Sequence, residues 1–152
     1  MERIASFQVD HDKLEPGMYL SRRDGNVTTF DLRFKKPNTG DLLTNAEMHS
    51  VEHIIATLLR NGKAKDAVIY FGPMGCQTGF YLLVDSNQLT DEQAVDLVKD
   101  TFATGAAYDG PMPGYSSVEC GNYRNLSTEL AKNQCAAYCE IVKDWTAEKL
   151  AY

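Results

Sequence analysis

Residues 44–62 read TNAEMHSVEHIIATLLRNG, and this stretch decides how the chain is organised. Thr44 is followed three residues later by Glu47, a capping box that starts a helix by satisfying its first free backbone N–H groups. Apolar residues then recur at helical spacing, and Gly62 marks the expected end. We therefore predict an amphipathic helix over about 45–60, with one face turned towards the core.

The same helix carries the motif H-x-x-E-H from His49 to His53. Residues four apart share one face of a helix, so the two imidazoles can bind one metal ion together. Glu52 lies beside them and can serve as a base without being a ligand, which is the arrangement of a catalytic metal site. The alternative is two histidines placed by chance, with Glu52 solvated. Two of the chain's 3 histidines fall in the motif, which favours the metal interpretation.

A catalytic metal site needs a third protein ligand, and Cys120 is the candidate. It ends a predicted strand over 115–120 and is followed by Gly121, where the backbone can turn sharply. A buried structural cysteine explains the residue equally well. Two histidines and a thiolate suit zinc or ferrous iron, and ligand softness does not decide between them.

The other three cysteines differ in their surroundings. Cys76 lies in the loop GPMGCQT at 72–78, and reactive residues concentrate on such loops. A nearby metal cation would favour its thiolate form, whereas an inert turn cysteine is the alternative. Cys135 and Cys139 lie on a predicted C-terminal helix among apolar neighbours, so core packing is favoured over metal binding.

Composition limits the classes of function. A chain of 152 residues with 43% hydrophobic and 24% charged residues predicts one domain, 1–152, with an ordinary core. Its net charge of -6 argues against nucleic acid or an anionic membrane as a partner. We find no apolar run of transmembrane length and no signal-peptide core at the start. We therefore expect a cytoplasmic protein with reduced cysteines.

The remaining pattern mixes strands and helices without strict alternation. Thr90 with Gln93 starts a second helix that ends near Gly105, and Ser127 caps the C-terminal helix. The predicted strands cover 4–10, 18–22, 30–34, 67–71, 79–84 and 115–120. Within 30–34, Arg33 falls on the face opposite the apolar residues and is expected to be solvated. A hairpin-length loop joins one strand pair, so we predict an α+β fold with a mainly antiparallel sheet packed against helices.

These residues together resemble the S-ribosylhomocysteine lyase family, also called autoinducer-2 synthases. The run PMGCQTGFY from Pro73 to Tyr81 is far more specific than H-x-x-E-H alone. The matching pieces span nearly the whole chain in the family's order. They are Ser6-Phe7, His11, Phe30 to Arg33, Met48 to His53, Arg60-Asn61, Gly72 to Tyr81 and Glu119 to Arg124.

The resemblance implies a function and a role for each matching residue. It implies cleavage of the thioether of S-ribosylhomocysteine, by an α+β homodimer with its sites near the subunit interface. One Fe²⁺ per chain, with Zn²⁺ or Co²⁺ as substitutes, would be held by His49, His53 and Cys120. Glu52 and Cys76 would be the general acid/base pair, and Ser6, His11 and Arg33 would line the substrate pocket. One departure is Tyr70, which stands where many members have an acidic residue that holds the homocysteine end.

Two other functions fit parts of the pattern. In a small inverted-zincin metallopeptidase, Glu52 would activate a metal-bound water. Those enzymes usually take a carboxylate as the third ligand, and Cys76 would have no task. In a non-enzymatic metal-binding or thiol-sensing domain, a fourth protein ligand would close the site. Release of free thiol from S-ribosylhomocysteine separates all three.

Overall fold

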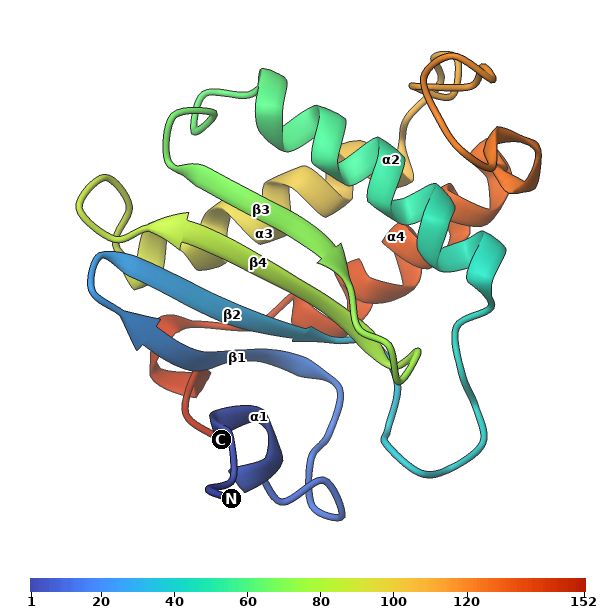
Figure 1. Cartoon of the computed structure of the whole chain (residues 1–152). Coiled ribbons are helices and arrows are strands. Elements are labelled where there is room, and N and C mark those ends of the chain that lie inside the picture. The colour runs from blue at the N-terminus through green and yellow to red at the C-terminus, as the bar shows by residue number, and fades with distance from the viewer.

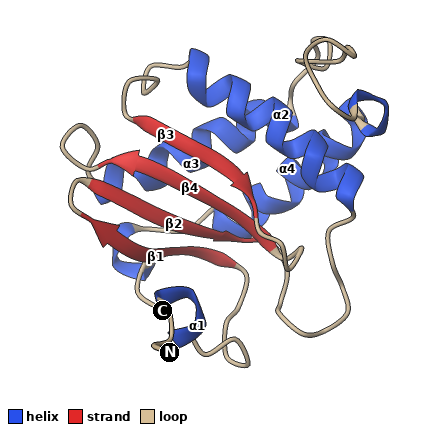
Figure 2. Cartoon of the chain, viewed as in Figure 1, coloured by secondary structure: helices blue, strands red, loops and turns tan.

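The computed structural model describes residues 1–152 and has an α+β fold. Its strands form one antiparallel sheet in the order β1-β2-β4-β3. The long helices α2, α3 and α4 lie together on one face of the sheet, and the short α1 lies on the other side beside both chain ends (Figure 1; Figure 2). The elements are α1 (Ala5–Gln8), β1 (Gly17–Asp24), β2 (Val27–Arg33), α2 (Asn45–Asn61), β3 (Val68–Pro73), β4 (Gly79–Asp85), α3 (Asp91–Ala106), η1 (Tyr123–Asn125), α4 (Thr128–Val142) and η2 (Ala147–Lys149).

The three long helices begin where the local sequence predicts. Thr44 and Thr90 each form a complete capping box, with both reciprocal hydrogen bonds present. Ser127 caps α4 by accepting a hydrogen bond from the backbone N–H of Leu130. The metal-motif helix ends at Asn61 as expected, although Gly62 is extended there rather than left-handed. The prediction of a mainly antiparallel sheet packed against helices is confirmed.

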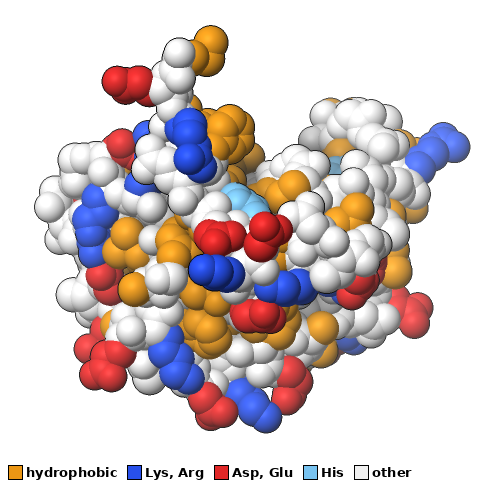
Figure 3. Space-filling model, turned by 90° about the horizontal axis from the view of Figure 1, so that it is seen from below, with side chains coloured by type: hydrophobic (Ala, Val, Ile, Leu, Met, Phe, Trp, Pro, Cys, Tyr) orange, Lys and Arg blue, Asp and Glu red, His pale blue; other side chains and the backbone are white.

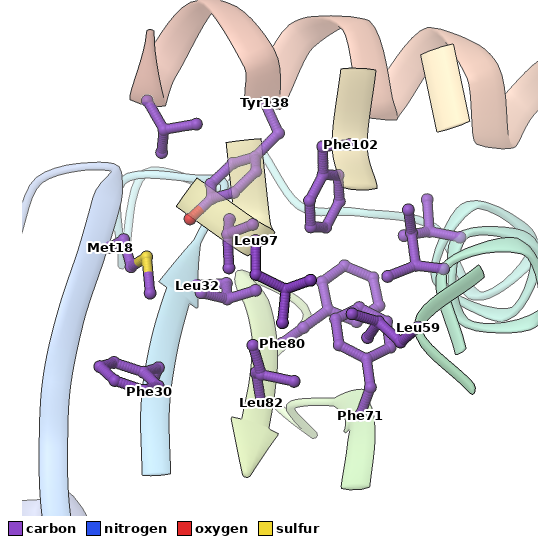
Figure 4. Close-up of a cluster of buried hydrophobic side chains, with 14 of the residues drawn as sticks. Met18, Phe30, Leu32, Leu59, Phe71, Phe80, Leu82, Leu97, Phe102 and Tyr138 are labelled. Atoms are coloured by element: carbon purple, nitrogen blue, oxygen red, sulfur yellow. The ribbon is translucent and has the colours of Figure 1, made fainter. Parts of the chain in front are cut away.

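The core fills the space between the sheet and the three long helices. Alternate residues of the two central strands point into it, and aromatic side chains of α3 and α4 pack over them (Figure 4). Burying one such large apolar side chain contributes about 1.5–3 kcal/mol. The labelled side chains of Figure 4 are Met18, Phe30, Leu32, Leu59, Phe71, Phe80, Leu82, Leu97, Phe102 and Tyr138.

One polar contact within this core holds α2, the helix that carries H-x-x-E-H, against the start of α4. The Ser50 side chain is fully buried on α2, and its Oγ accepts a hydrogen bond of 2.9 Å from the backbone N–H of Ser127 at the start of α4. Gly105 of α3 lies so close to Cys135 that an added Cβ would be 2.9 Å from its Sγ. Cys135 is therefore a packing residue, as predicted.

Two predicted strands are wrong. Within residues 4–10, Ala5–Gln8 form the helix α1, because this segment has no neighbouring strand to pair with. Residues 115–120 form a turn in which the N–H groups of Glu119 and Cys120 both bond to the carbonyl of Ser116. Cys120 therefore follows a turn rather than ending a strand.

Two sequence predictions concern membrane-spanning helices and the state of the cysteines. None of the helices has the length and apolar composition that crossing a membrane requires. All four cysteines are free thiols.

Candidate active site

The residues predicted as metal ligands come together in space. His49 and His53 lie one turn apart on α2, and Cys120 reaches them from the segment between α3 and η1. One ligand atom from each lies within 4.8 Å of the others, and Cys120 Sγ is 3.3 Å from His49 Nε2. The three side chains are all partly buried. They are therefore positioned to bind a single metal ion.

Hydrogen bonds on the far side of each imidazole support this geometry. His53 Nδ1 lies 2.8 Å from the carbonyl oxygen of Pro113, which can only accept. His49 Nδ1 contacts Asn125 Oδ1, and the Asn125 amide donates to Asn45 Oδ1 at 2.7 Å, which orients its oxygen towards the histidine. Both Nδ1 atoms thus carry the proton, which leaves each Nε2 lone pair for a metal.

The segment that carries Cys120 lies tightly against the histidines. Gly114 has φ +70, and an added Cβ would be 3.0 Å from the His53 ring, so only glycine fits without strain. The backbone N–H of Asn122 donates to Cys120 Sγ at 3.4 Å, which fixes the position of the sulfur. This one segment therefore supplies a ligand and also contacts both ligand histidines.

The donor set fits a catalytic metal rather than a closed structural one. Two neutral imidazoles and one thiolate leave one tetrahedral position free, where substrate or water can bind. The half-buried Glu52 lies on α2 between the histidines, but its carboxylate is not part of the group of ligand atoms. On the face seen from below, Lys and Arg side chains are interspersed with Asp, Glu and apolar side chains (Figure 3). The chemistry available is Lewis-acid catalysis with a nearby carboxylate base.

A second group of site residues gathers around Arg33. The prediction of a solvated Arg33 is wrong, since its side chain is 3% exposed and that of its partner Asp31 is 1% exposed. Nε and Nη2 of Arg33 hold the two Asp31 oxygens at 3.1 and 2.6 Å. Burial opposes the charge on Arg33, but the hydrogen bond and charge of Asp31 outweigh it and raise its pKa. The ion pair of Arg33 and Asp31 is buried because Thr78 and Tyr152, which are distant in the sequence, cover this end of β2.

The remaining nitrogen of Arg33 faces Cys76. Nη1 donates to Thr78 Oγ1 at 2.7 Å and lies 3.9 Å from Cys76 Sγ. Thr78 Oγ1 is itself 3.1 Å from that sulfur. Because Arg33 can only donate, the Thr78 hydroxyl accepts from it and can direct its own hydrogen to Cys76. Two of the predicted site residues, Arg33 and Cys76, are thus brought together.

The loop that carries Cys76 is tied to the start of the metal-motif helix. Gln77 accepts from the backbone N–H of Leu43 at 2.9 Å, and its side-chain amide donates to the Leu43 carbonyl at 2.9 Å. Leu43 directly precedes Thr44, the cap of α2. The exposed thiol of Cys76 and the two candidate ligand histidines therefore belong to connected parts of the fold.

Tyr152 completes the Arg33 group, and sequence reasoning missed it. Its hydroxyl donates to Asp31 Oδ2 at 2.7 Å, and its ring stacks on Tyr19 with centroids 5.1 Å apart. Burial, together with the charge of Asp31, raises the pKa of Tyr152. No local pattern signals this contact, because Tyr152 and Asp31 are 121 residues apart.

Ser6 and His11 lie apart from the metal group within one chain. Ser6 of α1 lines a cavity of about 400 Å³ on the sheet face opposite the long helices, together with Tyr70 and Tyr81. His11 Nδ1 lies 2.9 Å from the carbonyl of Val9 in its own turn. Two of the three residues expected to line the substrate pocket, Ser6 and His11, are thus not part of the group formed by His49, His53 and Cys120.

Comparison with known proteins gives one consistent result. Residues 4–149 match the model of the S-ribosylhomocysteinase (LuxS) family. S-ribosylhomocysteine lyase of Desulfotalea psychrophila is 50% identical to this chain, over 98% of the chain and 96% of the relative. The lyase of Finegoldia magna is 44% identical over 100% and 99%, and that of Clostridium beijerinckii is 40% identical over 100% and 99%.

Proposed function

This chain belongs to the S-ribosylhomocysteinase (LuxS) family, and on that premise we propose how its residues carry out the reaction for which its curated relatives are named. It is a carbon–sulfur lyase that cleaves S-ribosylhomocysteine to homocysteine and 4,5-dihydroxy-2,3-pentanedione, the autoinducer-2 precursor. The observation that carries the proposed residue roles is the convergence of His49, His53 and Cys120 beside the half-buried Glu52.

The chemistry explains why such a site is needed. A thioether sulfur leaves readily only when a carbonyl lies next to the carbon that is deprotonated. The sugar carbonyl therefore moves first from C1 to C2 and then to C3, and each move takes a proton from one carbon and returns one to its neighbour. Removal of the C4 proton then breaks the C5–S bond, and the homocysteine sulfur leaves as a thiolate that takes up a proton. Each carbonyl shift oxidises one carbon and reduces its neighbour, so the substrate as a whole is neither oxidised nor reduced.

Glu52 and Cys76 are the proposed proton carriers. They come from different elements, the helix α2 and the loop between β3 and β4, so they can serve different sides of the sugar. Glu52 is half-buried beside the ligand histidines, where a carboxylate can act on a carbon next to the bound carbonyl. Cys76 has the hydroxyl of Thr78 at 3.1 Å from its sulfur, and this hydroxyl can exchange a hydrogen bond with the thiol.

We propose Fe²⁺ as the metal, one per chain, held by His49, His53 and Cys120, with Zn²⁺ or Co²⁺ as substitutes. When bound, it supplies a Lewis acid that polarises the sugar's carbonyl and hydroxyl oxygens. The two-imidazole, one-thiolate donor set supports all three ions. Elemental analysis of protein purified without oxygen tests the choice: iron should be found at about one per chain, and equal durability of the iron and zinc forms in air would count against iron.

The proposal includes a homodimer with sites near the interface. Ser6 and His11 lie apart from the metal group of their own chain, as a shared pocket requires. Near them, Ile4 and Phe7 are 55% and 65% exposed, and Tyr70 on the open sheet face is 52% exposed. Two such faces in contact would cover apolar surface, and each chain's Ser6 and His11 could then reach the other chain's metal group.

Subunit exchange tests this arrangement. A variant that lacks the side chains of Ser6 and His11 should be inactive, and so should a Glu52→Gln variant. A mixture of the two should regain activity, because one of its two sites combines intact residues from both chains. An active monomer in analytical ultracentrifugation would contradict the shared pocket while leaving the lyase function in place.

We also propose a cytoplasmic location, which is supported by the free thiols of all four cysteines.

A further inference from the structure

The hydrogen-bond partner of His49 is itself held in place. Asn125, the last residue of η1, contacts His49 Nδ1 through its side-chain oxygen. Its side-chain nitrogen donates to Asn45 Oδ1 at 2.7 Å, and Asn45 is the first residue of α2. Two side-chain hydrogen bonds therefore run in series from Asn45 through Asn125 to His49. The series begins and ends on the same helix, α2.

These two hydrogen bonds fix the orientation of the Asn125 amide, with its oxygen facing His49 and its nitrogen facing Asn45. A side-chain amide that pointed its nitrogen at His49 would donate to Nδ1 and leave the ring proton on Nε2, where it would block a metal. The bond to Asn45 opposes that orientation, because it needs the Asn125 nitrogen on the other side. Asn125 thus holds the proton of His49 on Nδ1 and turns Nε2 towards Cys120 Sγ, 3.3 Å away.

His53 is held differently. Its Nδ1 bonds to a backbone carbonyl, that of Pro113, which has no alternative orientation and does not depend on a side chain. The backbone therefore secures one metal ligand, whereas His49 depends on the pair Asn45 and Asn125. A side-chain substitution can loosen the His49 end of the site without touching a ligand.

We propose that Asn125, oriented by Asn45, is a positioning residue that sets the metal affinity of this site through His49. The inference rests on the proposed function only in taking His49, His53 and Cys120 as the ligands. It adds two residues that lie outside the group of candidate ligand atoms. The expected effect of losing such an outer partner is about 10- to 100-fold in metal affinity.

The test measures metal affinity directly. The purified full-length protein loaded with Co²⁺ or Zn²⁺ is titrated with a chelator, and the visible spectrum of the cobalt form is recorded. Asn125→Leu, which is similar in size but cannot accept a hydrogen bond, should bind both ions about 10- to 100-fold more weakly and change the cobalt spectrum. Asn125→Asp keeps an acceptor for His49 and should stay within about 3-fold of the parent, since carboxylates also serve as outer partners of metal-bound histidine.

Two further variants separate positioning from loss of structure. Asn122→Leu makes the same substitution in the same segment, where the exposed side chain forms no capping hydrogen bond, and should leave affinity and spectrum unchanged. Asn45→Ala should weaken binding less than Asn125→Leu does, because it frees the Asn125 amide to rotate without removing it. Circular dichroism compares the folding of all four variants.

The outcomes separate this inference from the proposed function. Unchanged affinity in a folded Asn125→Leu protein would overturn the role of Asn125, and so would equal weakening by Asn122→Leu. Either result would leave the lyase function intact. If Asn125→Leu does not fold, a loss of affinity in Asn125→Asp equal to a ligand deletion would also overturn the inference. A parent protein that binds neither ion would instead contradict the proposed metal site.

Discussion

Cys120 Sγ lies 3.3 Å from His49 Nε2, although the two residues are 71 positions apart in the sequence. This contact brings together a helix that its own sequence specifies and a turn that no local pattern predicts. The backbone on both sides of Cys120 is held against α2, by Gly114 at His53 and by Asn125 at His49. The fold thus places a cysteine sulfur beside two imidazoles.

The Cys120→Ala protein should lose most of its metal and its activity, because two imidazoles alone hold a divalent ion weakly. Elemental analysis after dialysis gives the metal content per chain. Cys135→Ala and Cys139→Ala are the matched controls and should retain the metal, since Cys135 packs against Gly105 in the core. Full metal content in the Cys120→Ala protein would remove Cys120 from the site.

The Glu52→Gln and Cys76→Ala proteins should keep their metal and lose turnover. Each lacks a proton carrier, and such a loss typically lowers the rate about 10²- to 10⁴-fold. The loss should fall on kcat, because the substrate can still reach the metal. Deuterium incorporation into unreacted substrate, followed by NMR, shows which step stops: one variant should exchange the C2 proton without releasing homocysteine. A Cys76→Ala protein with normal kcat would make Cys76 a turn residue only.

Tyr152→Phe should destabilise the fold while keeping the ring that stacks on Tyr19. The lost hydroxyl leaves the buried carboxylate of Asp31 with one donor fewer. A hydrogen bond to a charged group contributes about 1.5–3 kcal/mol, so urea unfolding should show a loss of that order. Tyr115→Phe is the control: Tyr115 is 51% exposed, close to the 48% of Tyr152, but its hydroxyl has no hydrogen-bond partner in the protein, so the stability of this variant should be unchanged. Equal stability of both variants would mean that the Tyr152 hydroxyl is not needed.

Stability should fall in alkaline solution, and Cys135 contributes to the early part of the fall. Burial raises the pKa of its thiol from 9.0 to about 12. As the pH rises above 9, the thiol of the unfolded chain ionises before that of the folded chain. The contribution of Cys135 to the free energy of unfolding is therefore complete below pH 9 and is lost progressively up to about pH 12. One such group changes the free energy of unfolding by at most about 1.4 kcal/mol per pH unit.

Urea titrations at several pH values, with reductant present, measure this effect. Cys135→Ala should lower stability at pH 7 and flatten the decline just above pH 9. Tyr138 is fully buried with its pKa raised above 10.0, so its contribution begins higher and should remain in the variant. An identical slope with and without Cys135 would rule out its part in the alkaline decline.

The sequence predicts the helices well because their signals are local. A threonine and its partner three residues later meet whatever the rest of the chain does, so both capping boxes form as expected. His49 and His53 share a face for the same reason. Short apolar segments are different: residues 4–10 and 115–120 resemble strands, but a strand also needs a neighbour, and neither has one.

The surroundings of the site depend on contacts between distant residues. Arg33 looks solvated from the alternation of its strand, yet Tyr152 and Thr78 cover the Asp31 pair to which it belongs. Pro113 and Asn125 carry no sequence signal for a metal site, and only the folded loop shows that they hold the histidines. Cys120 could be chosen over a packing cysteine only through the family resemblance.

We propose above all that this metal group, with Glu52 as a proton carrier, cleaves S-ribosylhomocysteine. The most direct test incubates metal-loaded protein with that substrate and measures free thiol with a trapping dye and the dihydroxypentanedione by mass spectrometry. We predict equal amounts of thiol and diketone, with release abolished by chelator, restored by Co²⁺ and lowered about 10²- to 10⁴-fold by Glu52→Gln. If metal-loaded, folded protein releases no thiol, or releases as much after Glu52→Gln, then this group with Glu52 does not carry out the cleavage.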